Sequence, residues 1–398
     1  MMQTLAGLSK GSKAAFAVVL VGALCLLAGP YLDFLMVWPK ALTVPMTEWI
    51  TDGLGGFLKA IKPAMRWVSW VLGFGMMAAN WLLVSTPWIV VIGVTTALGW
   101  YLGGWKMAAL GFGGLGFVLA SGYWVESMNT LALVFVSVPL ALLLGTSIGI
   151  LAYEVPRVKA AVQAVLDLMQ TIPVFAYLVP ILILFGFGPT SAIVATLIYA
   201  MPPMTRITML ALKSVPSETH DLGKMIGCSP RQMMWRVLVP SAKDGLLVGM
   251  NQVIMLSLNM VIIASMIGAG GLGFDVLAAL RRLDFGAGLE AGFAIVALAI
   301  ALDRLSQAFA ARASVPGTVL PESGLLARHP YVVAGLAVAV GAALIGLILP
   351  AVQTYPEQLQ ITTGTFWSRV VEWINVNSFD ALEAVKNFLL LNISMLSH

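Results

Sequence analysis

Long apolar stretches separated by short polar segments run through the whole chain. A helix needs about 20 mainly apolar residues to cross a bilayer. Nine stretches come close to that length, at 14–37, 86–103, 105–122, 130–152, 161–186, 191–212, 245–268, 289–310 and 331–350. The pattern predicts an all-α polytopic membrane protein with about nine transmembrane helices. We expect the first to be an uncleaved helix, because its apolar run exceeds a signal-peptide core.

Composition supports a membrane protein. Of 398 residues, 60% are hydrophobic and only 10% charged, and the mean hydropathy is +0.94. A soluble domain carries about 25% charged residues, so a soluble globular enzyme, a disordered chain and a secreted disulfide scaffold are excluded. The net charge of +4 is scattered along the chain, which argues against nucleic-acid binding. The three histidines have no second ligand at a metal-binding spacing, so we expect no metal site, and the two cysteines lie in such different contexts that we expect no disulfide between them.

The distribution of lysine and arginine predicts the orientation. With a cytoplasmic N-terminus, the inner segments hold 12 basic residues and the outer segments 8. Five of the inner ones lie in one loop, 213–243. The positive-inside rule therefore favours a cytoplasmic N-terminus and a periplasmic C-terminus. The segment 38–85 opposes this choice, because it places four basic residues outside.

Two segments outside the predicted spans have amphipathic character. Segment 38–85 contains five tryptophans and helically spaced polar residues, which favours interfacial helices. Its indole rings are typical of membrane-interface anchors, although an aromatic cage for a cationic ligand is the alternative. The C-terminal segment 351–398 resembles it in pattern and indicates no function by itself.

Glycine-rich motifs argue against a nucleotide site. The runs 111–116 and 268–273 both fit G-x-G-x-x-G, but they lie within or at the end of predicted spans and not between a strand and a helix. We interpret them as sites of close helix packing. The chain also lacks the G-x-x-x-x-G-K-[ST] pattern, so it has no P-loop with which to hydrolyse ATP.

The inner loop 213–243 is the most informative polar segment. Ser217 is placed to cap a helix that carries Glu218 and Asp221 in its first turns and stops at Gly227. Ser229 and the proline after it begin a second helix, which we expect Pro240 to end. This helix–turn–helix carries several apolar side chains that suggest a docking surface: Met225, Ile226, Met233, Met234 and Trp235. A hairpin folded against its own helix ends is the alternative.

The same loop resembles the EAA loop of ABC-importer permeases, E-A-A-x3-G-x9-I-x-L-P. Gly227 and Pro240 match, whereas Asp221 replaces the glutamate and Leu222 and Gly223 replace the alanines. Val237 and Val239 stand for the isoleucine and the leucine. The stretches 167–173, 201–206, 249–252, 261–273, 282–284, 290–292 and 302–304 resemble permeases that import glycine betaine, proline betaine and related quaternary amines. The resemblance covers roughly 127–312.

The resemblance implies a type I ABC importer permease core of five helices at 127–312. Residues 1–126 would add N-terminal helices and 313–398 an extra helix with an outer tail. It implies a multi-pass protein of a prokaryotic inner membrane, working as a homodimer with cytosolic P-loop ATP-binding subunits and an extracytoplasmic substrate-binding protein. ATP and Mg²⁺ would be bound by the partner subunit, with no cofactor in this chain. The cargo would be glycine betaine, proline betaine, choline, carnitine or trimethylamine N-oxide.

The resemblance also assigns expected roles to residues in the loop 213–243. Energy would reach the permease through a rigid contact with the ATPase subunits. The expected coupling residues are Glu218, Asp221, Gly223, Met225, Gly227, Ser229, Trp235 and Pro240.

Polar residues inside apolar helices are the candidates for a translocation path, because each is costly in lipid unless it faces protein or water. They are Gln170, Thr171, Tyr199, Asn251, Gln252, Ser257, Asn259 and Ser265. Interhelical hydrogen bonding is the alternative role for each of them. Arg206 is expected to form a structural ion pair with Asp167 or Asp303, or to snorkel to the headgroups.

An ion-coupled secondary transporter of a small amine is the alternative class of function. That class is typified by inverted repeats and buried ionisable residues, and the sequence provides little of either. We therefore expect the permease function.

Overall fold

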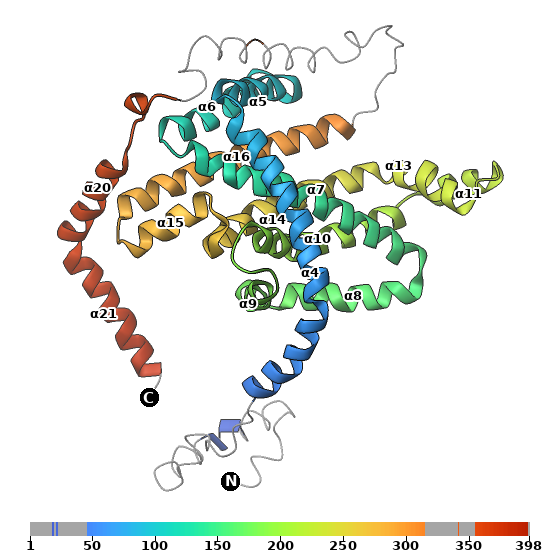
Figure 1. Cartoon of the computed structure of the whole chain (residues 1–398), viewed down its shortest axis with the longest axis horizontal. Helices are drawn as coiled ribbons and strands as arrows, with labels where there is room; N and C mark the ends of the chain where they lie inside the picture. The colour runs from blue at the N-terminus through green and yellow to red at the C-terminus, as the bar shows by residue number, and fades with distance from the viewer. Residues whose placement is uncertain (1–17, 20, 23–45, 315–340, 342–354, 397–398) are drawn as a thin grey trace, which may run out of the picture. The chain divides into compact units, whose positions relative to one another are not determined.

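The structure is a computed structural model that describes residues 18–19, 21–22, 46–314, 341 and 355–396. The regular elements in this part are all helical, as predicted (Figure 1). The chain divides into two compact units, residues 1–63 and 64–398. Apart from positions 18–19 and 21–22 and the start of one helix, the described residues belong to the second unit. The predicted spans 14–37 and 331–350 lie outside the described residues, apart from five positions.

Four predicted spans correspond to helices long and apolar enough to cross a membrane. They are α7 (Trp124–Glu154), α10 (Pro189–Lys213), α14 (Lys243–Ala264) continued by η3 (Ser265–Ala269), and α16 (Phe285–Ser314). The predicted count of nine is not reached by the described residues, which hold five such helices, or six with one bent pair.

The predicted span 161–186 is a bent pair of helices. The chain turns by 104° between α8 (Pro156–Thr171) and α9 (Val174–Phe185). Ile172 precedes Pro173 and takes the extended conformation (φ −71°, ψ 126°), because a proline ring disfavours helical backbone at the residue before it. A single straight helix was therefore the wrong prediction here.

The fifth long helix lies where no span was predicted. Helix α4 (Met46–Ser85) is continuous for 40 residues, and its part Ala60–Ser85 is apolar enough to cross a membrane. The expectation of an outer interfacial segment at 38–85 needs correction over this part. Polar residues in the first half obscured the uncharged run that follows Arg66.

Helices α5 (Trp88–Gly103) and α6 (Trp105–Ala120) form a tight hairpin around Gly104, whose φ is +72°. The backbones approach closely, since a Cβ on Gly99 would lie 2.7 Å from the Met107 carbonyl oxygen. Each helix has 16 residues, which corresponds to about 24 Å. This is less than the roughly 30 Å of bilayer hydrocarbon, so neither helix alone has the length of the predicted full span.

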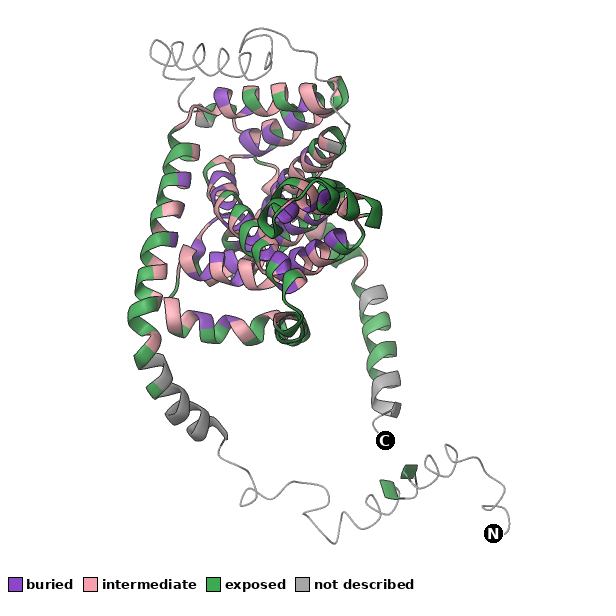
Figure 2. Ribbon diagram, turned by 90° about the vertical axis from the view of Figure 1, so that its right-hand side faces the viewer, coloured by how far each residue is buried: buried purple, intermediate pink, exposed green. Residues whose placement is uncertain are grey.

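Helix α10 packs between α7 and α14 through small residues. A Cβ on Gly145 of α7 would lie 2.7 Å from Met204 Cβ, and one on Gly249 of α14 would lie 2.7 Å from Met204 Sδ. Met204 is 3% exposed between them. Without a hydrophobic force between helices in lipid, such close approach supplies the packing energy. Figure 2 shows the buried residues gathered where these central helices cross.

The two glycine runs differ from each other. In 111–116, Gly114 packs on the Ala297 carbonyl of α16, as expected for close helix packing, but Gly113 and Gly116 meet nothing within 4 Å. In 268–273, three glycines have positive φ and break the chain between η3 and α15 (Leu272–Arg281). The second run thus forms a turn, and two of its glycines also pack closely, as expected. A Cβ on Gly271 would lie 2.5 Å from Thr130 Oγ1 of α7, and one on Gly273 would lie 2.2 Å from the Ile262 carbonyl oxygen of α14.

The C-terminal tail, 355–396, contains α20 (Gly364–Asn377) and α21 (Phe379–Leu396). The Ile361 N–H donates to the Ala120 carbonyl at 2.7 Å, and the rings of Phe293 and Trp367 lie 5.1 Å apart. Glu290, only 4% exposed, accepts hydrogen bonds from the backbone and hydroxyl of Thr363, the residue before α20. The tail is thus held at the N-terminal end of α16.

Candidate functional site

The loop 213–243 forms the projecting hairpin 217–241, built from α11 (Ser217–Met225), α12 (Pro230–Gln232), η2 (Met233–Leu238) and α13 (Val239–Ser241) (Figure 1). Helix α11 ends at Gly227 (φ +75°), with paired backbone bonds from Gly227 to Lys224 and from Cys228 to Gly223. Ser229 and Gln232 form a reciprocal capping box. Local sequence signals therefore define the turn of the hairpin.

Two expectations about the hairpin are wrong. Ser217 does not cap α11, because Pro216 occupies the N-cap position and no side chain bonds there. Pro240 does not end the second helix, since η2 continues into α13 and the Ala242 N–H bonds to the Leu238 carbonyl. Proline stops a regular helix by meeting the preceding turn. Here the wider π-helical turn of η2 accommodates the ring.

The base of the hairpin is anchored in a buried cluster. Met233, Met234 and Leu238 pack with Ile150 of α7 and Leu212 of α10. The hairpin is therefore joined by apolar contacts to the ends of two membrane-spanning helices.

A close contact holds the two arms of the hairpin together. Gly223 of α11 lies against Met233 of η2, whose Cε would be 2.6 Å from an added Cβ. This explains why the EAA pattern asks for a small residue at this position, whereas Leu222 at the other alanine position is 59% exposed.

Apolar side chains are exposed on both arms of the hairpin. Met225 and Ile226 at its tip are 85% and 67% exposed, and Trp235 of η2 is 62% exposed. Glu218 and Asp221 are also exposed, and Asp221 lies 3.9 Å from Lys224. A buried base below an exposed apolar tip is the arrangement of a docking element.

A second candidate site is a cavity of about 440 Å³ at the bend between α8 and α9. Four predicted path residues line it together: Gln170, Thr171, Tyr199 and Gln252. They come from α8, α10 and α14, and Tyr199 and Gln252 lie near the middle of their helices. The volume suits a small solute. Amide and hydroxyl groups supply hydrogen-bond donors in an otherwise apolar wall.

The other predicted path residues lie elsewhere. Asn251 accepts a hydrogen bond from Ser306 at 2.7 Å, and Ser265 donates to the carbonyl of Ile262, so both have partners within the helix bundle. Ser257 is buried with an unpartnered hydroxyl, and Asn259 is exposed. The cavity does not include these four.

Arg206 forms an ion pair with Asp167, one of its two expected partners, and thus joins α10 to α8. Asp303 instead accepts a hydrogen bond from Gln307 at 2.8 Å. The pair is partly exposed, so it fixes geometry more than it stabilises the fold. Arg206 neutralises the Asp167 carboxylate beside the cavity, so this carboxylate is not available to pair with a bound cation.

Sequence reasoning missed a group of residues at the opposite end of the helices. Tyr123 donates a hydrogen bond to the Ala287 carbonyl at 3.3 Å, and burial followed by the Glu290 carboxylate raises the pKa of Tyr123 to about 12. Burial, followed by Glu126, raises the pKa of Asp275 to about 6. These residues are far apart in the sequence. Only Glu290 was noted from the sequence, as part of the stretch 290–292.

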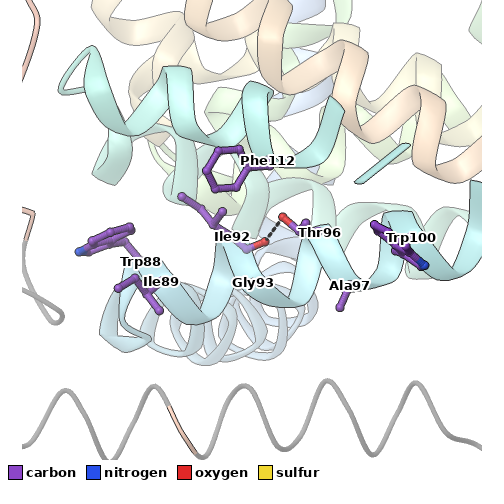
Figure 3. Close-up of a pocket in the computed structure, with 8 residues that line it drawn as sticks. All are labelled: Trp88, Ile89, Ile92, Gly93, Thr96, Ala97, Trp100 and Phe112. Atoms are coloured by element: carbon purple, nitrogen blue, oxygen red, sulfur yellow. Dashed lines mark hydrogen bonds between the residues drawn. The ribbon is translucent and has the colours of Figure 1, made fainter. Parts of the chain in front are cut away.

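An apolar groove of about 440 Å³ lies along α5 and α6, with Trp88, Trp100 and Phe112 in its wall (Figure 3). Trp88 and Trp100 are 12 residues apart on one helix, or about 18 Å. Rings around a methylated ammonium must lie within about 6 Å of it. The groove is therefore no aromatic cage.

The fold and these two sites define a polytopic α-helical membrane protein with a projecting hairpin on one side and a mid-helix cavity. Residues 137–315 match the family "Binding-protein-dependent transport system inner membrane component". The glycine betaine/proline betaine transport system permease protein ProW of Escherichia coli (strain K12) is 38% identical over 265 residues, 67% of this chain and 75% of ProW. The chain belongs to this family of transport-system permeases.

Two further relatives extend the comparison. The glycine betaine/carnitine transport permease protein GbuB of Listeria monocytogenes is 38% identical over 275 residues, 68% of this chain and 97% of GbuB. The trimethylamine N-oxide transport system permease protein TmoV of Ruegeria pomeroyi is 36% identical over 355 residues, 88% of this chain and 52% of TmoV. The chain thus spans about half the length of TmoV.

Proposed function

We propose that this chain is the membrane permease of an ATP-driven importer for a small methylated amine, such as trimethylamine N-oxide, glycine betaine, proline betaine, choline or carnitine. The observation that carries the proposal is the 217–241 hairpin, with its buried base and exposed apolar tip. Relatives named as permeases for glycine betaine, carnitine and trimethylamine N-oxide support it.

The mechanism follows from how the hairpin is attached. Its base packs on Leu212 at the end of α10, and Tyr199 of the same helix lines the cavity. The 13 residues between them correspond to about 20 Å of helix. Closure of two ATP-binding subunits against the tip would move α10 and change access to the cavity. Met225 and Trp235 would make the contact. Gly227, Ser229 and Pro240 would fix the course of the hairpin, and Gly223 would let its two arms pack closely.

The partners of the importer follow from what the chain lacks in sequence. Without a P-loop, the chain would take its energy from separate cytosolic ATP-binding subunits, which would bind ATP and Mg²⁺. A second copy of the permease and an extracytoplasmic substrate-binding protein would complete the assembly. Met225, Trp235, Glu218 and Asp221 would form the surface that meets the motor subunits.

The cavity would suit a solute with a methylated nitrogen and at least one oxygen. Gln170 and Gln252 offer amide N–H donors to an oxygen of the solute, and Tyr199 offers a hydroxyl and a ring face. The carboxylate of Asp167 is paired with Arg206. A zwitterion or an N-oxide carries its own negative oxygen and so needs no free carboxylate from the protein.

The hairpin lies on the cytoplasmic side in this proposal. Lys243 beside it donates to the Ala313 carbonyl at the end of α16. The tail is held at the other end of α16, which supports a periplasmic tail. A crossing at Ala60–Ser85 would bring Lys62 and Arg66, two of the four basic residues in 38–85, to the inner side and so reduce the conflict with the positive-inside rule.

The test is reconstitution of the full chain in proteoliposomes with a candidate ATP-binding subunit and binding protein. We expect ATP-dependent uptake of trimethylamine N-oxide or glycine betaine. We expect more than tenfold loss in Met225→Ser/Trp235→Ser, because exposed apolar anchors dominate docking energies. The control Val376→Ser/Trp373→Ser changes equally exposed residues of α20 and should retain uptake. Uptake by the chain alone, driven by an ion gradient, would instead establish a secondary transporter.

A substitution in the cavity tests the path. Tyr199→Phe removes one hydroxyl donor and keeps the ring, so we expect a higher KM for uptake with little change in assembly. Asn251→Ala lies outside the cavity and serves as the comparison. An unchanged KM for both variants would remove Tyr199 from the path.

A further inference from the structure

A second, smaller cavity lies at the end of the helices next to the hairpin. It has a volume of about 290 Å³ and is lined by Ala152, Tyr153, Pro156, Lys159, Met209 and Lys213. These residues come from the end of α7, the first turn of α8 and the end of α10. The cavity therefore lies at the level where two membrane-spanning helices end, on the side that carries the hairpin.

The cavity has the chemistry of a phosphate site. Lys159 and Lys213 approach it from two different helices, and neither forms an ion pair within the described part of the chain. Both ammonium groups are on exposed residues, so an anion can reach them. The Tyr153 hydroxyl adds a hydrogen-bond donor at the wall.

The start of α8 adds a third feature. Pro156 is its first residue, and no side chain caps this helix, which is 16 residues long. The helix dipole favours negative charge at such an end. The first residue of α8 and the two lysines, Lys159 and Lys213, thus line the same cavity.

The surroundings favour a lipid over a free anion. Leu151, Val155 and Leu210 are 48%, 37% and 67% exposed, each next to a residue that lines the cavity. Apolar side chains at the end of a membrane-spanning helix contact acyl chains at little cost. The anionic surface of a cytoplasmic leaflet attracts basic residues at this depth.

We propose that the cavity between Tyr153, Lys159 and Lys213 binds the phosphate of an anionic phospholipid from the cytoplasmic leaflet. Tyr153 also packs against the cluster that anchors the hairpin. A bound headgroup would join the ends of α7, α8 and α10 beside that anchor. The assignment rests on the proposed sidedness, but lipid binding is measured without transport.

The experiment is native mass spectrometry of the purified, delipidated full chain titrated with phosphatidylglycerol or phosphatidylcholine. We expect a clear preference for phosphatidylglycerol. Each basic residue near the surface contributes about fivefold to anionic lipid binding, so Lys159→Gln/Lys213→Gln should lose about 25-fold. Lys159→Arg/Lys213→Arg should retain binding.

Controls separate this site from general charge and from free phosphate. Lys106→Gln/Lys386→Gln removes the same charge from exposed positions on α6 and α21 and should bind as the wild type does. Equal phosphatidylglycerol binding by the wild type and Lys159→Gln/Lys213→Gln, with both folded by circular dichroism, would overturn the proposal. Binding of inorganic phosphate that is lost in the same variant, without a preference for the lipid, would overturn the lipid assignment.

Discussion

The two arms of the hairpin 217–241 meet across Gly223, and the C-terminal tail meets α16 across Gly286, but the atoms facing the two glycines differ. A Cβ on Gly223 in the hairpin would meet Cε of Met233, the far end of a flexible side chain. A Cβ on Gly286 would lie 2.0 Å from the backbone oxygen of Gly364 in the tail. A side chain can rotate away, whereas a carbonyl moves only with its helix. The hairpin contact is therefore adaptable and the tail contact rigid.

The largest effect is expected for Gly286→Ala. The added methyl group would force α20 away from α16, and overpacking of this kind costs about 3 kcal/mol. We expect faster hydrogen exchange in 361–377, while α7 and α10 keep their protection. The matched control Gly113→Ala meets nothing within 4 Å and should leave exchange unchanged. Equal protection of α20 in Gly286→Ala and the wild type would show that the tail is not held by this contact.

A smaller effect is expected for Glu290→Gln. The amide oxygen can still accept from the Thr363 N–H, but the charge that strengthens this bond at the start of α20 is lost. We expect a cost of about 1 kcal/mol, seen as an intermediate rise of exchange in α20. Glu383→Gln removes an exposed carboxylate from α21 and should have no such effect. Exchange in α20 as fast as in Gly286→Ala would mean that the carboxylate contributes as much as the backbone contact.

The hairpin and the tail also differ in how far the sequence predicted their contacts. Capping signals within 213–243 predicted a hairpin with its turn at Gly227 and Ser229, because a turn depends on neighbouring residues. The contact of Glu290 with Thr363 joins residues 73 positions apart, and no local pattern reports such a pair.

The helices and the cavity show the same division between local and distant signals. Apolar run length predicted α7, α10, α14 and α16, since lipid imposes that pattern directly. It did not predict the 104° bend after α8, because run length does not register the effect of Pro173 on the backbone of Ile172. The polar residues of the cavity were identified singly, but only the fold shows which four of them converge.

A still smaller effect, with a pH dependence, is expected for Asp275→Asn near the tail attachment. Burial, and then Glu126, raises the pKa of Asp275 from 3.8 to about 6 in the folded state. The folded chain therefore binds more protons than the unfolded chain between about pH 4 and pH 6, and its stability falls as the pH rises through that window. Above pH 6 the wild type carries the full cost of a partly buried charge.

The measurement is the thermal unfolding midpoint of the detergent-solubilised chain at pH 4 and pH 7.5. We expect Asp275→Asn to exceed the wild type at pH 7.5 and to match it at pH 4. Glu383→Gln is the exposed control, and its difference from the wild type should not change with pH. A stabilisation by Asp275→Asn that is the same at both pH values would assign the effect to packing and not to the charge.

The smallest effect is expected for Gly223→Ala in the hairpin. Its comparison with Gly286→Ala tests most directly whether the two glycine contacts differ in rigidity. Alanine is favoured over glycine by about 1 kcal/mol within a helix. This gain offsets the free-energy cost of displacing the Met233 methyl group. We therefore expect unchanged stability and unchanged ATP-driven uptake.

Gly223→Leu provides the opposite case, because its side chain would also reach Val237, whose Cγ2 lies 3.6 Å from the Cβ position. That variant should separate α11 from η2 and lower uptake while leaving the cavity and α10 in place. A large loss of uptake in Gly223→Ala would show that the Met233 side chain cannot move away from the added methyl group. A rigid contact of that kind would contradict the adaptability inferred from Met233.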